Sequence, residues 1–141
     1  MTQRKRIALV AHDARKADLL DWVQSNSAKL ARHELLATGT TGGRIQAATD
    51  LSVCALKSGP LGGDQQLGAR LADGKLDMLI FFWDPMTAQP HDVDVKALLR
   101  MAILYNVVVA CNRSTADFVI SSDLFDADYD PQVKDYEALL H

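Results

Sequence analysis

The chain alternates between two kinds of hydrophobic pattern along its length. Short runs rich in Val, Ile and Leu are typical of strands that are buried on both faces. Between them, apolar residues recur at i, i+3, i+4 and i+7, as in Val95, Leu98, Leu99 and Ala102, which predicts amphipathic helices. The predicted strands are residues 6–12, 33–38, 52–58, 76–83 and 106–112, and the predicted helices begin near Ala14, Gly43, Gly63, Asp92 and Ser114.

Regular alternation of strands and helices is the pattern of a parallel sheet covered by helices on both faces. We therefore predict a single doubly wound α/β domain with a five-stranded, mainly parallel sheet. A length of 141 residues with 48% hydrophobic residues suffices for one core, so the domain is expected to span residues 1–141. The acidic, less periodic segment from Asp123 onward is expected to be a surface or subunit-contact segment.

Charge and cysteine usage argue against several partners and compartments. The 15 basic and 18 acidic residues are scattered, so a formal charge of -3 indicates neither a nucleic acid nor a membrane partner. The apolar run of residues 7–11 is too short for a signal peptide or a membrane span. Cys54 and Cys111 lie in apolar, strand-like stretches and are expected to be buried reduced thiols. A cytoplasmic location is therefore expected.

The unusual polar residues follow the predicted strands. Because open α/β sheets bind ligands beyond the carboxyl ends of their strands, we expect these residues to gather at one edge. In chain order they are His12 and Asp13, then Thr38 to Gly43, then Lys57 to Asp64, then Asp84, His91, Asp92 and Asp94.

Two glycine-rich turns are candidates for binding a phosphate. The first, TGTTGG at residues 38–43, supplies hydroxyls and free N–H groups where a helix begins. It is neither a Walker loop nor a dinucleotide fingerprint, and it could equally be a polar turn with a capping threonine. The second, SGPLGGD at residues 58–64, would add further N–H groups beside it. Lys16 could reach the same pocket or remain an exposed surface lysine.

Asp64 has two interpretations. It could cap the helix that begins near it, or it could act as a general base that removes a carbon-bound proton. The second role needs a pKa raised by burial, whereas a helix N-terminus lowers the pKa, and the sequence does not decide between them.

His91 could likewise be a solvated loop residue. Asp92 and Asp94 lie close enough in the chain to fix its tautomer, which favours a role in moving protons.

Metal-binding patterns are incomplete. Asp126, Asp128, Asp130 and Glu137 have the spacing of a calcium-binding loop, but Pro131 occupies the position of the turning glycine. No Cys or His pair has zinc spacing, so no metal is expected.

Taken together, the strings AHD, ATGTTG, SGP, GGDQQ, FFWDP, PHD, DVKALLR and TADF resemble the methylglyoxal synthase family over residues 6–122. The resemblance implies conversion of dihydroxyacetone phosphate to methylglyoxal and phosphate through an enediol phosphate, without a cofactor. It implies that Asp64 is the catalytic base and His91 the proton shuttle. The residues matching the family's phosphate pocket are Lys16, Thr38, Thr40, Thr41, Ser58 and Gly59, and those matching its polar lining are His12, Asp13, Asp84 and Asp94.

The resemblance also implies a homohexamer inhibited by inorganic phosphate. One departure concerns the C-terminus, because relatives can carry an arginine there that links sites across subunits, and this chain ends in YEALLH. Cooperativity is therefore less expected than the oligomer itself.

Two other functions remain open. An enediolate beside a phosphoester either loses phosphate, as in a lyase, or is reprotonated, as in a triose phosphate isomerase-type enzyme. A domain of this fold could also be a non-catalytic effector sensor, although this chain shows no companion domain and keeps both Asp64 and His91.

Overall fold

A single sheet organises residues 1–140, the part of the chain that the computed structural model describes. Its strand order is β3-β2-β1-β4-β5, and every neighbouring pair is parallel. This confirms the predicted fold class and makes the sheet fully rather than mainly parallel. The strands are β1 (Arg6–Ala11), β2 (Glu34–Thr38), β3 (Val53–Leu56), β4 (Met78–Phe82) and β5 (Val108–Ala110).

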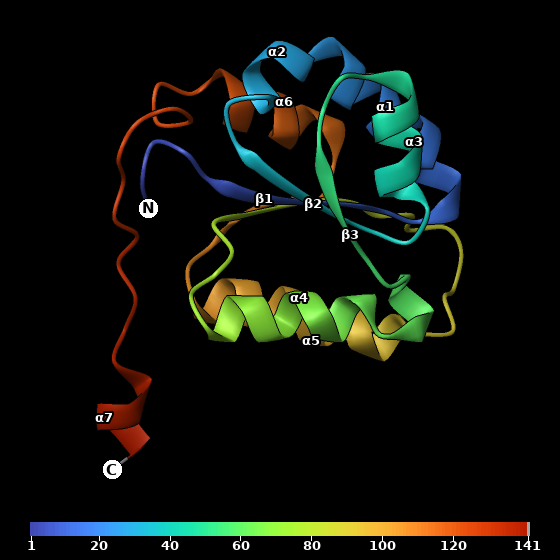
Figure 1. The fold of residues 1–141 in the computed structure, drawn as a ribbon. Helices are drawn as coiled ribbons and strands as arrows, with labels where there is room; N and C mark the ends of the chain where they lie inside the picture. The colour runs from blue at the N-terminus through green and yellow to red at the C-terminus, as the bar shows by residue number, and fades with distance from the viewer. Residues whose placement is uncertain (141) are drawn as a thin grey trace.

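Helices cover both faces of this sheet (Figure 1). One face carries α1 (Lys16–Ser25), α2 (Ser27–Leu30), α3 (Thr41–Ala48) and α6 (Arg113–Ser121), and the other carries α4 (Gly63–Ala72) and α5 (Asp92–Leu104). The five predicted helix starts lie within two residues of the observed starts of α1, α3, α4, α5 and α6. The shorter elements were not predicted; they are α2, α7 (Tyr136–Leu140) and the 3-10 turns η1 (Asp13–Arg15) and η2 (Gly59–Leu61).

Strand β1 is buried on both faces and separates two hydrophobic cores. Ile7 and Leu9 face the core that contains Trp22, whereas Ala8 and Val10 face the core that contains Leu67 and its neighbours on α5. The alternation along one strand explains why its sequence is continuously apolar.

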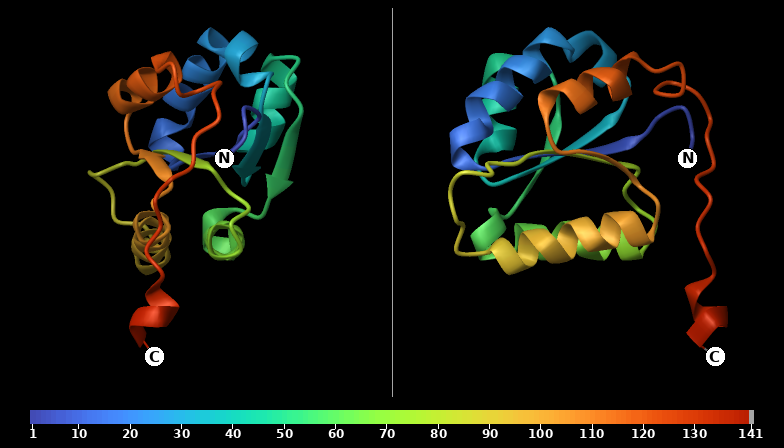
Figure 2. Two further views of the ribbon diagram at one scale, coloured as in Figure 1. Left: turned by 90° about the vertical axis from the view of Figure 1, so that its left-hand side faces the viewer. Right: turned by 180° about the vertical axis from the view of Figure 1, so that it is seen from behind.

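The direction in which successive strands are added to the sheet reverses between β1 and β4. The chain first moves outward from β1 to β2 and β3, and α4 then returns it to β4 on the other side of β1 (Figure 2). Ligands bind at such a switch point, beyond the carboxyl ends of the strands. Residues 12 and 84 follow these two strands there, and the His12 N–H donates to the Phe82 carbonyl over 3.2 Å.

The edge strand β3 is incompletely covered on the face toward α4 and α5, where only Leu56 of this strand is partly buried. Leu36 of β2 reaches the core above α4 and α5, but no residue of β3 is buried in that core. Cys54 is consequently exposed, and Cys111 is half-buried. The expectation of two buried thiols is therefore wrong for Cys54 and only partly met for Cys111. An apolar strand sequence does not reveal which strand lies at an uncovered edge.

The segment after α6 begins in the core and then leaves it. Phe125 is buried, and the Tyr129 N–H donates to the Met1 carbonyl over 3.0 Å. Beyond Asp130 the chain runs away from the sheet to α7, where Leu139 and Leu140 are exposed (Figure 1). Among residues 1–140, no helix is long and apolar enough to cross a membrane.

Candidate active site

A cavity of about 210 Å³ opens at the carboxyl ends of the central strands. It is lined by eight of the twelve residues predicted for the site, together with Val10, Ala11, Gly39, Pro60, Phe81 and Gln89. The eight are His12, Asp13, Lys16, Thr38, Ser58, Gly59, Asp64 and His91. Residues from five separate segments therefore meet at the predicted edge of the sheet.

Four buried side-chain atoms in residues 1–140 have no hydrogen-bond partner, and all four belong to predicted site residues. They are His12 Nε2, Thr41 Oγ1, Asp64 Oδ2 and His91 Nδ1. A buried polar group without a partner costs about 1 to 3 kcal/mol, so native proteins hold few of them. Their concentration at one place indicates groups that are kept free for a ligand.

Asp64 lies in the first turn of α4 and is only 3% exposed. Gly62 precedes the helix as its N-cap, and the Asp64 side chain makes no capping hydrogen bond. The capping interpretation is therefore wrong. Burial is the largest influence on this carboxyl and raises its pKa, and the nearby Asp94 raises it further while His91 opposes them. Burial therefore gives this carboxyl the raised pKa that the role of a general base requires.

His91 is the N-cap residue of α5 and reaches across to Asp64, with 3.7 Å between Nε2 and Oδ2. The expected orienting partners are arranged differently: the Asp92 carboxylate accepts the Gln89 N–H, and Asp94 contacts His91 through its backbone N–H. The carboxylate that faces the imidazole is thus Asp64. An alanine methyl at Gly59 would come within 2.7 Å of His91 Nε2, so the glycine is what lets the imidazole approach this closely.

His12 is held in one tautomer by the backbone. Its Nδ1 accepts the Asp84 N–H over 3.0 Å, so the neutral ring carries its proton on Nε2. Burial lowers the pKa of His12, and so does the nearby His91. The ring packs edge-on against Phe81, with 5.1 Å between centroids. His12 therefore presents a neutral N–H donor to the cavity.

Lys16 and the start of α3 form the cationic end of the site. The Lys16 ammonium is 2.9 Å from Asp13 Oδ1 and donates to the Thr40 hydroxyl over 3.4 Å, and its side chain is only 19% exposed. Thr40 is the N-cap of α3 without a side-chain capping bond, so the first N–H groups of that helix stay available. Free N–H groups, a hydroxyl and an ammonium together suit a phosphate.

The two glycine-rich turns lie side by side, but only part of the second can donate to a ligand. An alanine methyl at Gly39 would be 3.4 Å from the Ser58 Cβ. The N–H groups of residues 61–63, however, donate to the carbonyls of Ser58 and Gly59. The expectation of further free N–H groups from this turn therefore fails for residues 61–63.

Four predicted residues lie beside the cavity rather than in its lining. Thr40 contributes at the rim, as described, and Thr41 opens α3. The Asp84 carboxylate accepts the Met86 N–H over 2.9 Å and so holds the loop that leads to His91. Asp94 is half-buried on α5. Their roles in binding or catalysis stay predictions.

Gln89 is the polar lining residue that sequence reasoning missed. It precedes Pro90 in an irregular loop, and neither periodicity nor a motif marks it. Its side-chain amide donates to the Thr87 carbonyl over 3.3 Å.

No three His, Cys, Asp or Glu side chains of residues 1–140 converge as a metal site. The acidic tail is instead engaged elsewhere: Asp126 pairs with Arg32 and His33, and Asp130 with the N-terminus.

Comparisons with known proteins agree on one family. Residues 18–111 match the model of the MGS-like domain. A methylglyoxal synthase of Leptospira interrogans is 62% identical over 125 residues, which cover 89% of this chain and 84% of the relative. One of Oleidesulfovibrio alaskensis is 58% identical over 137 residues, covering 96% and 93%. The chain belongs to the methylglyoxal synthase family.

A solved structure of this family agrees with the fold. The methylglyoxal synthase of Elizabethkingia anophelis superposes with a TM-score of 0.93 at 50% identity, covering 99% of this chain and 92% of that one. The resemblance drawn from the sequence motifs is thereby confirmed, and the candidate site lies on a methylglyoxal synthase fold.

Proposed function

We propose that the chain is a cofactor-free lyase that converts dihydroxyacetone phosphate to methylglyoxal and inorganic phosphate. The observation that carries this proposal is the buried Asp64 carboxylate, whose unpartnered Oδ2 borders a cavity of about 210 Å³ and whose pKa is raised by burial. A desolvated carboxylate beside a small polar cavity suits removal of a proton from carbon.

The phosphate of the substrate fits the cationic end of the cavity. The N-terminus of α3, Lys16 and the hydroxyls of Thr38 and Thr40 would hold its oxygens. Ser58 and Gly59 close the site on the side of β3. The remaining three carbons would then extend toward Asp64 and His12, because these residues line the rest of the cavity.

In the first step Asp64 takes a proton from the hydroxymethyl carbon, and negative charge develops on the carbonyl oxygen. The His12 Nε2–H, which has no protein partner, is the donor available to that oxygen. A neutral donor that is already fixed in place stabilises the enediolate without reorganisation.

In the second step the enediol expels phosphate. The terminal hydroxyl loses its proton and becomes an aldehyde, the double bond shifts by one carbon, and the carbon–oxygen bond to phosphate breaks. The central oxygen must carry a proton in the resulting enol. The enol becomes methylglyoxal when its terminal carbon gains a proton and its hydroxyl loses one, and the proton that Asp64 removed is released with the phosphate. A proton therefore moves between two substrate oxygens, and His91, which lines the cavity beside Asp64, would move it.

One incubation tests the proposal against its alternatives. Purified protein with dihydroxyacetone phosphate should release methylglyoxal and phosphate in equal amounts. Glyceraldehyde 3-phosphate without phosphate release would indicate an isomerase, and substrate binding without turnover would indicate a sensor. Either result would overturn the lyase assignment.

The role of His91 has its own test. A His91→Gln variant should lose most turnover but keep some exchange of the substrate's carbon-bound proton with heavy water, because Asp64 remains. A variant with normal turnover would remove His91 from the mechanism.

We also propose a cytoplasmic homohexamer that is inhibited by inorganic phosphate. Inhibition is expected because product and substrate would share the site at Lys16 and α3. Exposed apolar side chains such as Leu61, Met86 and Phe118 support contacts with further copies. The two free cysteines are consistent with a reducing compartment. Light scattering of the purified protein would measure the number of subunits.

A further inference from the structure

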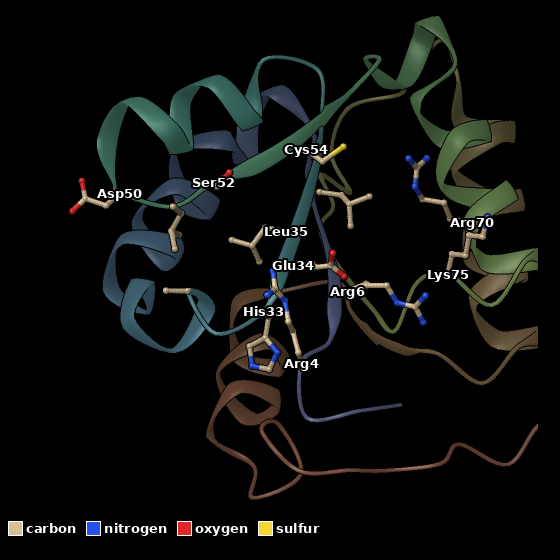
Figure 3. A pocket seen from close by; sticks show the side chains of 13 residues that line it. Arg4, Arg6, His33, Glu34, Leu35, Asp50, Ser52, Cys54, Arg70 and Lys75 are labelled. Atoms are coloured by element: carbon tan, nitrogen blue, oxygen red, sulfur yellow. The ribbon is translucent and has the colours of Figure 1, made fainter.

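A second and larger hollow lies at the opposite end of the sheet from the candidate active site. It measures about 580 Å³ and surrounds the amino ends of β1, β2 and β3 (Figure 3). We call it the amino-end groove. Its walls come from β3 on one side, including Cys54, and from the end of α4 on the other, including Arg70 and Lys75.

The groove exists because the two helices on this face leave part of the sheet bare. α4 and α5 pack against Ala8 and Val10 of β1 and against β4, whereas β2 adds only Leu36 to the buried part of that core. Glu34 and Cys54 are exposed on this uncovered surface. A partly apolar floor therefore lies open beside a charged wall.

Three cationic residues are linked through the backbone where α4 ends. The Lys75 N–H donates to the Arg70 carbonyl over 2.8 Å, and the Arg6 guanidinium donates to the Gly74 carbonyl over 2.9 Å. Arg6 is further held by Asp77 at 3.1 Å. Within residues 1–140, the side chains of Arg70 and Lys75 make neither a hydrogen bond nor an ion pair with the protein. Two cations on adjacent backbone are thus free beside a third that is fixed.

The charge of the groove is opposite to that of the whole chain. Its lining holds four cationic and two carboxylate side chains, although the chain carries a formal charge of -3. One of the carboxylates, Asp50, lies at the far end of the groove from Arg70 (Figure 3). The other carboxylate, Glu34, lies near Arg6, so the uncompensated cations at the α4 end are Arg70 and Lys75.

We propose that the amino-end groove binds a small phosphate ester or free phosphate at a site separate from the active site. The Arg70 guanidinium and the Lys75 ammonium line the same wall of the groove, and their combined charge matches that of a phosphate dianion. The floor at Leu36 and Cys54 accepts the apolar part of an ester. This site does not depend on the proposed lyase activity, because none of its residues belongs to the catalytic cavity.

The rate at which the Cys54 thiol is alkylated reports whether an anion occupies the groove. Its alkylation by neutral iodoacetamide is followed by peptide mass spectrometry, with half-buried Cys111 as the internal control at the other end of the sheet. Inorganic phosphate and glycerol 3-phosphate are the probes, at ionic strength held constant with chloride. A bound anion should slow labelling of Cys54 about threefold when its concentration is twice Kd, and should leave Cys111 unchanged.

Variants separate this site from its alternatives. In R70Q/K75Q the protection should disappear, while K96Q/R100Q, which removes the same charge from α5, should keep it. Activity with dihydroxyacetone phosphate should be unchanged in both variants. Protection of Cys54 therefore tests the groove, and activity separately tests the lyase assignment.

Three results would overturn the proposal. Absence of protection in the wild-type protein would show that Arg70 and Lys75 serve only to offset the negative end of α4. Protection that survives in R70Q/K75Q would place the anion elsewhere. Cys54 that is inert in the native protein but reactive in urea would show that another copy of the chain closes the groove.

Discussion

Replacement of Asp64 by asparagine tests the base without changing its size. The amide fills the same buried position in the first turn of α4 but cannot accept a proton. General-base catalysis contributes about 10²- to 10⁴-fold, so turnover should fall by at least this factor, or roughly 3 to 5 kcal/mol of barrier. Exchange of the substrate's carbon-bound proton in heavy water should fall with it.

The same substitution should raise stability at neutral and alkaline pH. Burial raises the pKa of Asp64 above its usual 3.8, so the native protein binds a proton that the unfolded chain releases. Stability therefore decreases as pH rises from about 3.8 through the raised pKa. Asparagine has no charge to desolvate, and no capping bond is lost, because Asp64 makes none. The melting temperature of Asp64→Asn should thus exceed that of the wild type at pH 8, and the difference should shrink in acid.

Three measurements on one variant decide the matter: melting temperature against pH, turnover, and deuterium incorporation into the substrate. A capping residue would give nearly normal turnover and a slightly lower melting temperature. A folded Asp64→Asn protein that exchanges the substrate proton at the wild-type rate would refute the assignment of the base. Asp13 would then be the next candidate, although its side chain is 97% exposed and Lys16 lowers its pKa.

Three further predictions concern the surroundings of the site. Gly63→Ala places a methyl 2.0 Å from the Lys57 carbonyl oxygen, so this substitution should shift α4 and lower turnover roughly 100-fold. Gly43→Ala is the control, because its methyl would meet nothing within 4 Å and turnover should stay unchanged. Thr40→Ala removes a hydroxyl from the cationic end and should weaken substrate and phosphate binding about tenfold in titrations; unchanged affinities would mean that the phosphate lies elsewhere. Burial lowers the pKa of His33, so the contribution of His33 to stability should be complete near pH 8 and should be lost as pH drops below about 6.5. Calorimetry should find this loss weaker in His33→Gln.

The fold could be predicted because local patterns and tertiary structure agree almost everywhere. Strand β1 alternates between two cores, and α5 carries its apolar residues at helical spacing, as the sequence indicated. The exposed Cys54 escaped prediction because β3 reads as a buried strand, and only the strand order and helix positions reveal its open face. Short elements such as α2 lack enough residues to show a period.

The position of the candidate site could be predicted from the sequence, and eight of the twelve predicted residues line the cavity, but the contacts among them could not be predicted. His12 and Asp64 follow strands whose carboxyl ends must converge, which placed them at one edge of the sheet. The sequence could not show that the backbone of Asp84 fixes the His12 tautomer, because the two residues are 72 positions apart. Nor could it show that Asp64, rather than Asp92, faces His91.

The unpartnered atoms set these residues apart from the other buried polar side chains of the described chain. Elsewhere in the described chain, buried polar groups are satisfied, as Lys5 is by the carbonyls of Thr2 and Ala127. At the site, burial without a partner lowers the stability of the free protein, because each such atom costs about 1 to 3 kcal/mol. Proteins retain such destabilising groups at sites where a ligand supplies the missing hydrogen-bond partner. A substrate with a phosphate, a carbonyl and a hydroxyl could supply a partner for each of the unpartnered donors and acceptors. Three of the four destabilised positions, His12, Asp64 and His91, also have a proposed chemical role, which is the arrangement expected of a binding site prepared before the substrate arrives.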